Sequence, residues 1–194
     1  MGFPSFSVGE VLTAADMNAV GLWRVTSCTV SSVGGTAATA SNGVITIGSN
    51  NTSVTVSNAF SADYSSYYIM CRGGTGSAPN NLTFQLSGIT GSVYRQLGFF
   101  QTFGTAAATD YSDGAGSTSW LLITTSTDGY AFNMTLHNPQ ATVRKFASIE
   151  GISTNNQYIF PSLCNSTASA TGFTLSIGAG NFSGGTIRVY GYRN

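Results

Sequence analysis

The chain has 194 residues, which is enough for one large domain with a core of its own. Charged residues make up only 7% of it, and seven Lys and Arg balance seven Asp and Glu. The charges are scattered, so no basic stripe exists to neutralise phosphates, and nucleic-acid binding is disfavoured. A surface so poor in charge and so rich in hydroxyls and amides indicates burial against neighbouring subunits in an assembly.

The three cysteines, Cys28, Cys71 and Cys164, are odd in number and far apart, and no C-x-x-C pair is present. This spacing argues against a disulfide scaffold or a zinc site, so we expect reduced, buried thiols and no metal or other cofactor. The first residues have neither a basic nor a long apolar region, and no apolar stretch approaches the roughly 18 residues of a membrane span. We therefore expect a protein made in the cytoplasm, without membrane insertion.

Near the N-terminus, Thr13 is followed three residues later by Asp16, the spacing of a helix-capping box. This pattern predicts a helix that begins at Ala14 and ends by Val20, since Gly21 follows. About two turns of helix do not persist alone in water, so this helix must dock on something.

Two docking partners are open for this segment. Its apolar residues pack on the chain's own β-domain, or they insert into a larger assembly or a three-fold contact between sister chains. We treat residues 1–23 as an anchoring segment. The residues expected to form the anchor are Leu12, Thr13, Asp16, Met17, Val20, Leu22 and Trp23.

From residue 24 to residue 194 the chain changes to short runs rich in Val, Ile, Thr, Tyr and Phe, separated by clusters of Gly, Asn, Asp and Ser. No helical period lies between these runs. Alternation is cleanest over residues 186–192. The predicted strands are 24–30, 44–47, 53–57, 67–72, 82–87, 94–103, 119–124, 130–137, 142–150, 158–163, 173–177 and 186–192.

Many short strands with regular turns between them favour an all-β domain, a two-sheet β-sandwich of jelly-roll type, over a βαβ fold. The dipeptide Asp128-Gly129 predicts a tight hairpin that joins the run at 121–124 to the run at 130–137. The small residues of 33–43 indicate a loop or linker.

Few residues could carry catalysis, so we expect no enzyme. His137 is the only histidine, and it stands at a predicted strand end, where a structural role is expected. Asp110 and Asp113 form the only close carboxylate pair among the loops. They lack the further ligands of a calcium loop, so a turn-forming role is expected for them.

Aromatic residues flanked by Asn, Ser and Gly suit contact with sugars and proteins, because stacking and hydrogen bonding need no net charge. Tyr111 and Trp120 lie on either side of the turn that begins at Asp113. These three residues are the candidates for contact with a ligand. Ordinary core packing is the alternative for each aromatic ring.

Three segments resemble a known group of proteins. Residues 8–18, Val-Gly-Glu-Val-Leu-Thr-Ala-Ala-Asp-Met-Asn, are similar to the start of many bacteriophage fibre and minor tail proteins. Residues 184–193, Gly-Gly-Thr-Ile-Arg-Val-Tyr-Gly-Tyr-Arg, resemble the last strand of the same group, and residues 56–67 resemble its F-x-x-x-Y-x-x-Y signature. The resemblance implies an N-terminus attached to the virion and an exposed β-domain that works as a homotrimer.

Three functions follow as hypotheses. The first is a tail-fibre or receptor-binding module that contacts a host glycan or protein. The second is a capsid decoration, or cement, protein that contacts other virion proteins on the head. The third and weakest is a tailspike that degrades polysaccharide with two carboxylates such as Asp110 and Asp128.

Overall fold

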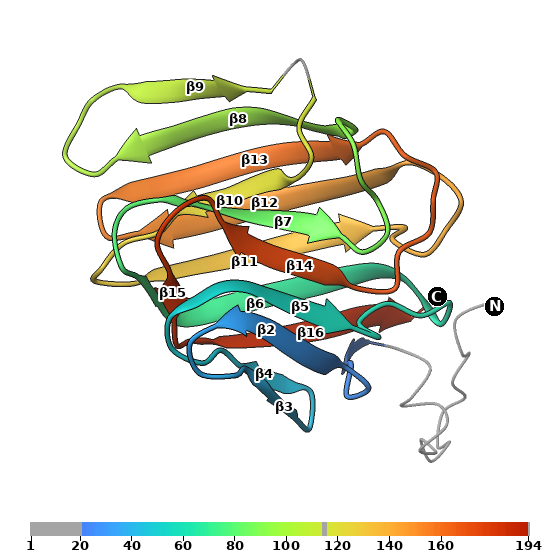
Figure 1. Ribbon diagram of the computed structural model, residues 1–194. Helices are drawn as coiled ribbons and strands as arrows, with labels where there is room; N and C mark the ends of the chain where they lie inside the picture. The colour runs from blue at the N-terminus through green and yellow to red at the C-terminus, as the bar shows by residue number, and fades with distance from the viewer. Residues whose placement is uncertain (1–20, 114–115, 194) are drawn as a thin grey trace, which may run out of the picture.

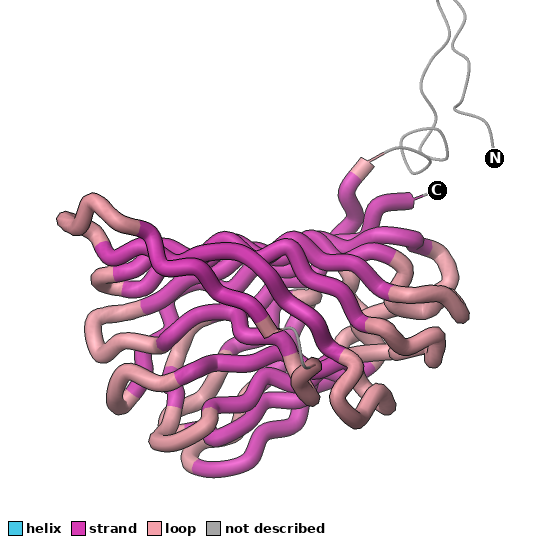
Figure 2. Tube along the Cα trace, turned by 90° about the horizontal axis from the view of Figure 1, so that it is seen from above, coloured by secondary structure: helices cyan, strands magenta, loops and turns pink. Residues whose placement is uncertain are grey.

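The computed structural model describes residues 21–113 and 116–193. The predicted helix and the anchor residues Leu12, Thr13, Asp16, Met17 and Val20 lie outside these ranges. The described residues form strands, turns and loops without any helix (Figure 2), so the all-β class is confirmed. Consequently no helix in this part of the protein could span a membrane.

Sixteen strands make up the described part of the chain. They are β1 (Leu22–Arg24), β2 (Thr29–Gly34), β3 (Thr39–Ser41), β4 (Val44–Thr46), β5 (Asn51–Ser57), β6 (Tyr64–Gly76), β7 (Asn81–Leu86), β8 (Tyr94–Thr102), β9 (Ala108–Ser112), β10 (Trp120–Thr124), β11 (Tyr130–His137), β12 (Lys145–Ser153), β13 (Asn156–Cys164), β14 (Phe173–Ile177), β15 (Phe182–Ser183) and β16 (Thr186–Arg193).

The strands form two layers, both antiparallel (Figure 1). The long layer has the order β9-β8-β13-β12-β11-β6-β16, and β1 and β4 both pair with the far edge of β16. The short layer has the order β10-β7-β14-β5-β2. The two layers are joined at one edge by β15, which pairs with β5 of the short layer and with the end of β6 of the long layer.

Alternating burial explains which face of each strand lies between the layers. In β11 and β12 every second side chain is buried, as expected for strands with one face on a core. Gly151 on β12 shows how closely the layers approach each other. A Cβ atom added there would lie 2.2 Å from Cγ2 of Ile123 on β10.

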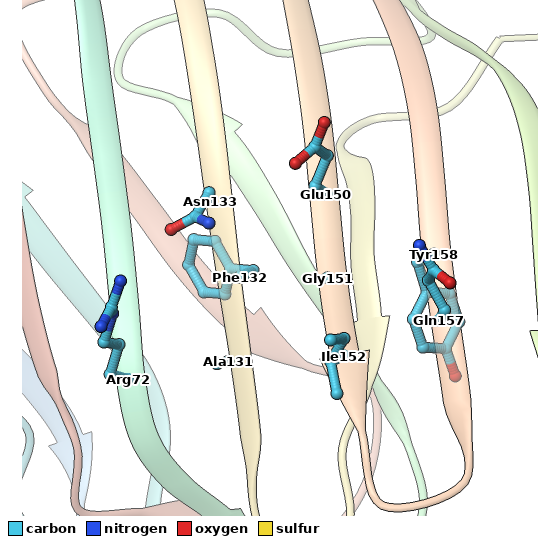
Figure 3. Close-up of a pocket in the computed structure, with 9 residues that line it drawn as sticks. All are labelled: Arg72, Ala131, Phe132, Asn133, Glu150, Gly151, Ile152, Gln157 and Tyr158. Carbon is cyan, nitrogen blue, oxygen red and sulfur yellow. The ribbon is translucent and has the colours of Figure 1, made fainter. Parts of the chain in front are cut away.

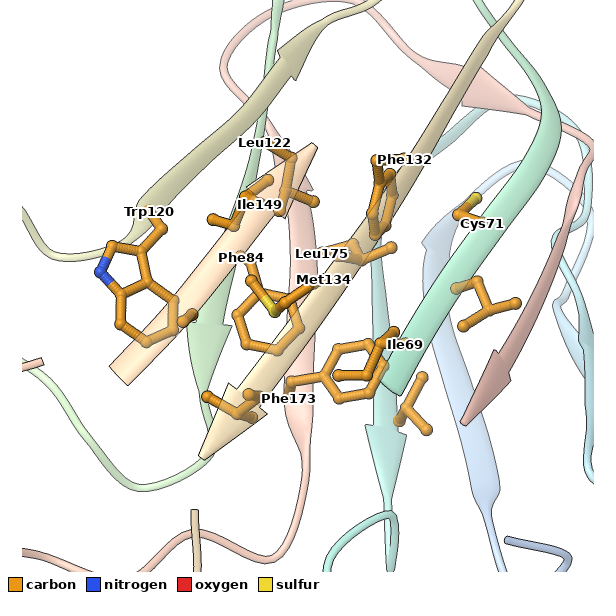
Figure 4. Packing of buried hydrophobic residues seen from close by; sticks show 14 of the residues in the cluster. Ile69, Cys71, Phe84, Trp120, Leu122, Phe132, Met134, Ile149, Phe173 and Leu175 are labelled. Atoms are coloured by element: carbon orange, nitrogen blue, oxygen red, sulfur yellow. The ribbon is translucent and has the colours of Figure 1, made fainter. Parts of the chain in front are cut away.

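Aromatic rings fill the centre of the core (Figure 4). The ring of Phe84 stacks on Phe173 at 4.7 Å between centroids and lies 6.1 Å from Trp120. Tyr94 of the long layer meets Trp120 edge to face at 5.2 Å. The Tyr94 hydroxyl donates to the carbonyl of Ile89 at 3.1 Å, so its polar end is satisfied inside the core.

The predicted hairpin at Asp128-Gly129 is wrong. β10 pairs with β7 in the short layer, whereas β11 pairs with β6 and β12 in the long layer. The segment between them therefore crosses from one layer to the other. Buried Thr125 holds this crossing in place, because its hydroxyl bonds to the carbonyls of Ala78 at 3.0 Å and Asn80 at 3.1 Å.

Several strand boundaries also differ from the prediction. The run predicted at 24–30 is two strands, β1 and β2, and the expected loop at 33–43 contains the end of β2 and all of β3. Leu22 and Trp23, predicted as anchor residues, lie in β1, where they pair with Tyr192 and Gly191 of β16. The expected boundary between residues 23 and 24 thus falls inside a strand.

The cysteines behave as predicted. Cys28, Cys71 and Cys164 are free and buried. Burial raises the pKa of Cys28 to about 11 and that of Cys71 to about 12. These thiols therefore pack as small apolar groups and carry little thiolate at neutral pH.

A buried lysine ties the loop before β12 to the loop after β13. Lys145 is fully buried, and its ammonium donates to the carbonyls of Ala141 at 2.9 Å, Val143 at 2.6 Å and Ser166 at 3.3 Å. Burial lowers the pKa of Lys145, whereas the nearby Cys164 raises it. The three carbonyl oxygens compensate the ammonium for its lost hydration.

We predict that Lys145→Met destabilises the fold by about 2–4 kcal/mol, because it leaves three carbonyl oxygens without their ammonium donor. Urea unfolding followed by tryptophan fluorescence measures this change. The adjacent exposed residue supplies the control, since Arg144→Met removes a charge without removing a buried hydrogen bond. Equal unfolding midpoints for the two variants would contradict this role of Lys145.

Candidate functional site

The two outer faces of the protein differ in chemistry. On the short layer the outward side chains of β2, β5, β14 and β7 are almost all hydroxyls and amides, and none is charged. They bond to each other, as where the hydroxyls of Thr55 and Thr174 meet at 2.9 Å. The outer face of the long layer carries arginines, a glutamate and large apolar side chains instead, so we place the candidate site there.

Strand register arranges the side chains of the long layer in rows. One row crosses β16, β6, β11 and β12 as Arg188, Met70, Asn133 and Glu150. The next row crosses the same strands as Tyr190, Tyr68, Thr135 and Ser148. The second row therefore passes from two tyrosines on β16 and β6 to two short hydroxyl side chains on β11 and β12, and the first row has Arg188 at one end and Glu150 at the other.

Exposed apolar side chains gather on the same face. Ile152 is 53% exposed and Phe146 is 51% exposed, both on β12, and Leu97 on β8 is 60% exposed. Leu22 and Tyr192, on β1 and β16, are exposed as well. A concentration of exposed large apolar groups on one face marks an interaction surface.

The first depression on this face has a volume of about 350 Å³. Its polar side chains are Arg72 of β6, Asn133 of β11, Glu150 of β12 and Gln157 of β13, which come from four neighbouring strands (Figure 3). Ile152 stands among them as an exposed apolar group. Ala131 and Gly151 also line the depression, so small side chains leave space between the larger ones.

The second depression has a volume of about 400 Å³ and lies at the β8 end of the face. It combines the cations Arg95 and Arg144 with Asp113 and Asn165, and Leu97 and Leu163 supply apolar surface. Such a mixture of ionic, amide and apolar groups suits a small polar ligand.

Backbone hydrogen bonds position the residues of the second depression. The amide of Asp113 donates to the carbonyl of Gln96 at 2.9 Å, which brings the end of β9 beside β8. The amide of Asn165 donates to the carbonyl of Val93 at 2.7 Å. Gly116 lets the following loop approach, since a Cβ atom there would lie 2.9 Å from Nη1 of Arg95.

The three predicted ligand-contact residues fall in different places. Asp113 lines the second depression. Tyr111 is half-buried with its ring 5.1 Å from that of Phe160, and burial, followed by the charge of Asp113, raises the pKa of Tyr111. Trp120 is fully buried and donates from its indole nitrogen to the carbonyl of Leu163 at 3.2 Å. Trp120 therefore belongs to the core, and its ring is not available to a ligand.

Sequence reasoning missed Arg95, Arg144 and Asn165. Arg95 lies on β8, Arg144 comes just before β12, and Asn165 comes directly after β13. Only the pairing of β13 with both β8 and β12 brings them together. No local signal in the sequence marks these three residues as neighbours.

The other residues considered for chemistry are dispersed. Asp110 lies in β9 rather than in a loop, and Asp128 lies in the crossing between β10 and β11. Nδ1 of His137 is 2.9 Å from the hydroxyl of Ser66 on the neighbouring strand β6. Across residues 21–113 and 116–193, no group of three or more His, Cys, Asp and Glu is placed to hold a metal ion.

No known protein-family model matches the chain, and no curated protein matches its sequence.

We predict opposite stability effects for two of the sequence candidates. Trp120→Ala should lower the free energy of unfolding by about 3–5 kcal/mol, because it leaves a cavity among the packed aromatic rings of the core. Asp113→Asn should change stability little, since this side chain is only half-buried at the rim of a depression. Chemical denaturation of both variants measures the difference, and a stable Trp120→Ala protein would contradict the core assignment.

Proposed function

We propose that this chain is a structural, non-enzymatic protein of a bacteriophage particle, a tail-fibre or receptor-binding module. The segment that precedes β1 attaches it to the virion, and the β-domain, which begins with β1 at Leu22, is exposed to the host. The resemblance of residues 8–18 and 184–193 to phage fibre and minor tail proteins supports the virion role. Other virion proteins and further copies of this chain, as a homotrimer, are its partners.

We also infer a jelly-roll β-sandwich. Successive strands from β5 to β8 alternate between the short and long layers, and β10 and β11 continue the alternation. The order β10-β7-β14-β5 in the short layer further supports this interpretation. In such a fold the loops gather at the ends of the sandwich, where they are free to vary.

The second depression is the observation that supports the host-contact role. Arg95 and Arg144 match a carboxylate or phosphate on a glycan, and Asp113 and Asn165 match sugar hydroxyls. Leu97 and Leu163 offer apolar surface to the C–H face of a sugar ring. We therefore propose a host cell-surface glycan as the ligand.

Competition with phage adsorption tests this proposal. Purified full-length protein should slow adsorption to host cells, whereas Arg144→Gln and Asp113→Asn should each weaken the competition at least tenfold. Asp128→Asn is the matched control, because it removes an exposed carboxylate outside both depressions. Full competition by the Arg144 and Asp113 variants, or none by the unmodified protein, would contradict the host-contact role.

A capsid decoration protein is the second candidate, and the apolar outer face of the long layer favours it, since such a face suits packing on a lattice. Antibody labelling of particles in the electron microscope separates the two. We expect label at the tail. Label confined to heads would replace the tail-fibre role with the cement role.

Release of reducing sugar from host glycans, lost in Asp110→Asn, would instead support the weaker tailspike alternative.

A further inference from the structure

The outer face of the long layer has two halves of opposite character. The bulky half, on β6 and β16, presents Tyr68, Met70, Arg72, Arg188 and Tyr190. The short half, on β11 and β12, presents Ala131, Asn133, Thr135, Ser148 and Glu150, with the larger His137 and Phe146 in the row at one end and Ile152 in the row at the other. The halves meet between β6 and β11, which are directly paired.

Charge follows the same division. The bulky half carries the cations Arg72 and Arg188, and the short half carries the anion Glu150. Arg188 and Glu150 lie in one row but three strands apart, which is about 14 Å at the usual strand spacing. Among the described residues, neither of them has an ion-pair partner. Each is therefore available to a charge on another molecule.

Consider a second copy related to the first by a half-turn about an axis that runs parallel to the strands, in the plane of contact and between β6 and β11. The second copy then meets this face with complementary side chains. The short half of the second copy covers the bulky half of the first, and each residue row of one copy lies opposite the same row of the other. Arg188 then faces Glu150 of the other copy, Tyr68 faces Thr135, and Tyr190 faces Ser148. Long side chains are thus placed opposite short ones, and opposite charges are placed together.

We propose that the part of this face formed by β16, β6, β11 and β12 is a self-association surface whose partner is a second copy of this chain, while the second depression at the β8 end lies beside it. In a closed ring of three, the same pairing joins the bulky half of each copy to the short half of the next. This inference deepens the assembly part of the proposed function and rests on it, but it does not depend on the glycan.

The face has the area of a small interface. The four strands and four residue rows of its two halves cover roughly 500 Å², compared with the roughly 800 Å² that each partner contributes to a standard stable interface. Ile152 and Phe146, each about half exposed, would be covered. The outer face of the short layer is a weaker candidate, because its uncharged hydroxyls are similar from edge to edge and already bond to each other, as Thr55 and Thr174 do, or to backbone carbonyls, as Thr83 does to Ser176.

The mass of the full chain in solution tests the proposal. By light scattering and sedimentation equilibrium, the protein should form a species at a multiple of the 20.1 kDa chain mass. Ile152→Arg should weaken association at least tenfold, because it places a charge at the contact. Val33→Arg is the matched control, since Val33 is 63% exposed on β2 of the short layer. It should leave association unchanged.

Charge exchange tests the pairing itself. Arg188→Glu and Glu150→Arg should each weaken association at least tenfold, and the double variant should recover most of it. Circular dichroism and thermal unfolding verify that each variant folds. The proposal is overturned if the unmodified protein is monomeric, or if neither single exchange weakens association. It is also overturned if the double variant does not recover association, or if Val33→Arg alone dissociates the protein. A protein that associates without competing for host cells would retain this interface and lose only the glycan role.

Discussion

The stacking of Phe84 on Phe173, with Trp120 and Tyr94 beside them, is the contact on which the rest of the structure depends. These rings come from both layers, and they set the distance and alignment between them. Once the inward faces are buried against each other, the register of every strand determines what its outward side chains present. The rows on the outer face of the long layer are therefore a consequence of core packing.

Scarcity of charge makes the distribution of charge informative. A chain with 7% charged residues places Arg72, Arg95, Arg188 and Glu150 on the outward positions of one layer and none on the outward positions of β2, β5, β7 and β14. Uncharged hydroxyls keep the outer face of the short layer hydrated without attracting charged partners. The two faces are thus suited to different neighbours, another protein chain on one side and solvent on the other.

Most strands could be predicted from the sequence, because one-sided burial leaves alternation in the residues themselves. β11 and β14 begin and end at the predicted residues. β9 was missed because its residues, Ala-Thr-Asp-Tyr-Ser, lack an apolar alternation and pair only at the edge of the layer. The hairpin at Asp128-Gly129 was predicted wrongly because turn residues indicate a reversal of the chain but not the layer in which the next strand continues.

The candidate site was predictable only in part. Asp113 was identified from its place beside aromatic residues, and it does line a depression. Trp120 was assigned to the same surface because it follows the turn that begins at Asp113, whereas its actual neighbours are Phe84 and Tyr94 from other strands. Arg95, Arg144 and Asn165 meet only through the pairing of β13 with β8 and β12. Contacts between strands distant in sequence leave no local pattern.

The most direct test of the account is an electron-microscopic reconstruction of the protein in intact phage particles, at a resolution that separates strands. We expect copies grouped around an axis that runs between β6 and β11, with the bulky half of one copy on the short half of the next and the hydroxyl face of the short layer outward. Copies that meet through β2, β5 and β14, or that stand singly on the particle, would contradict it.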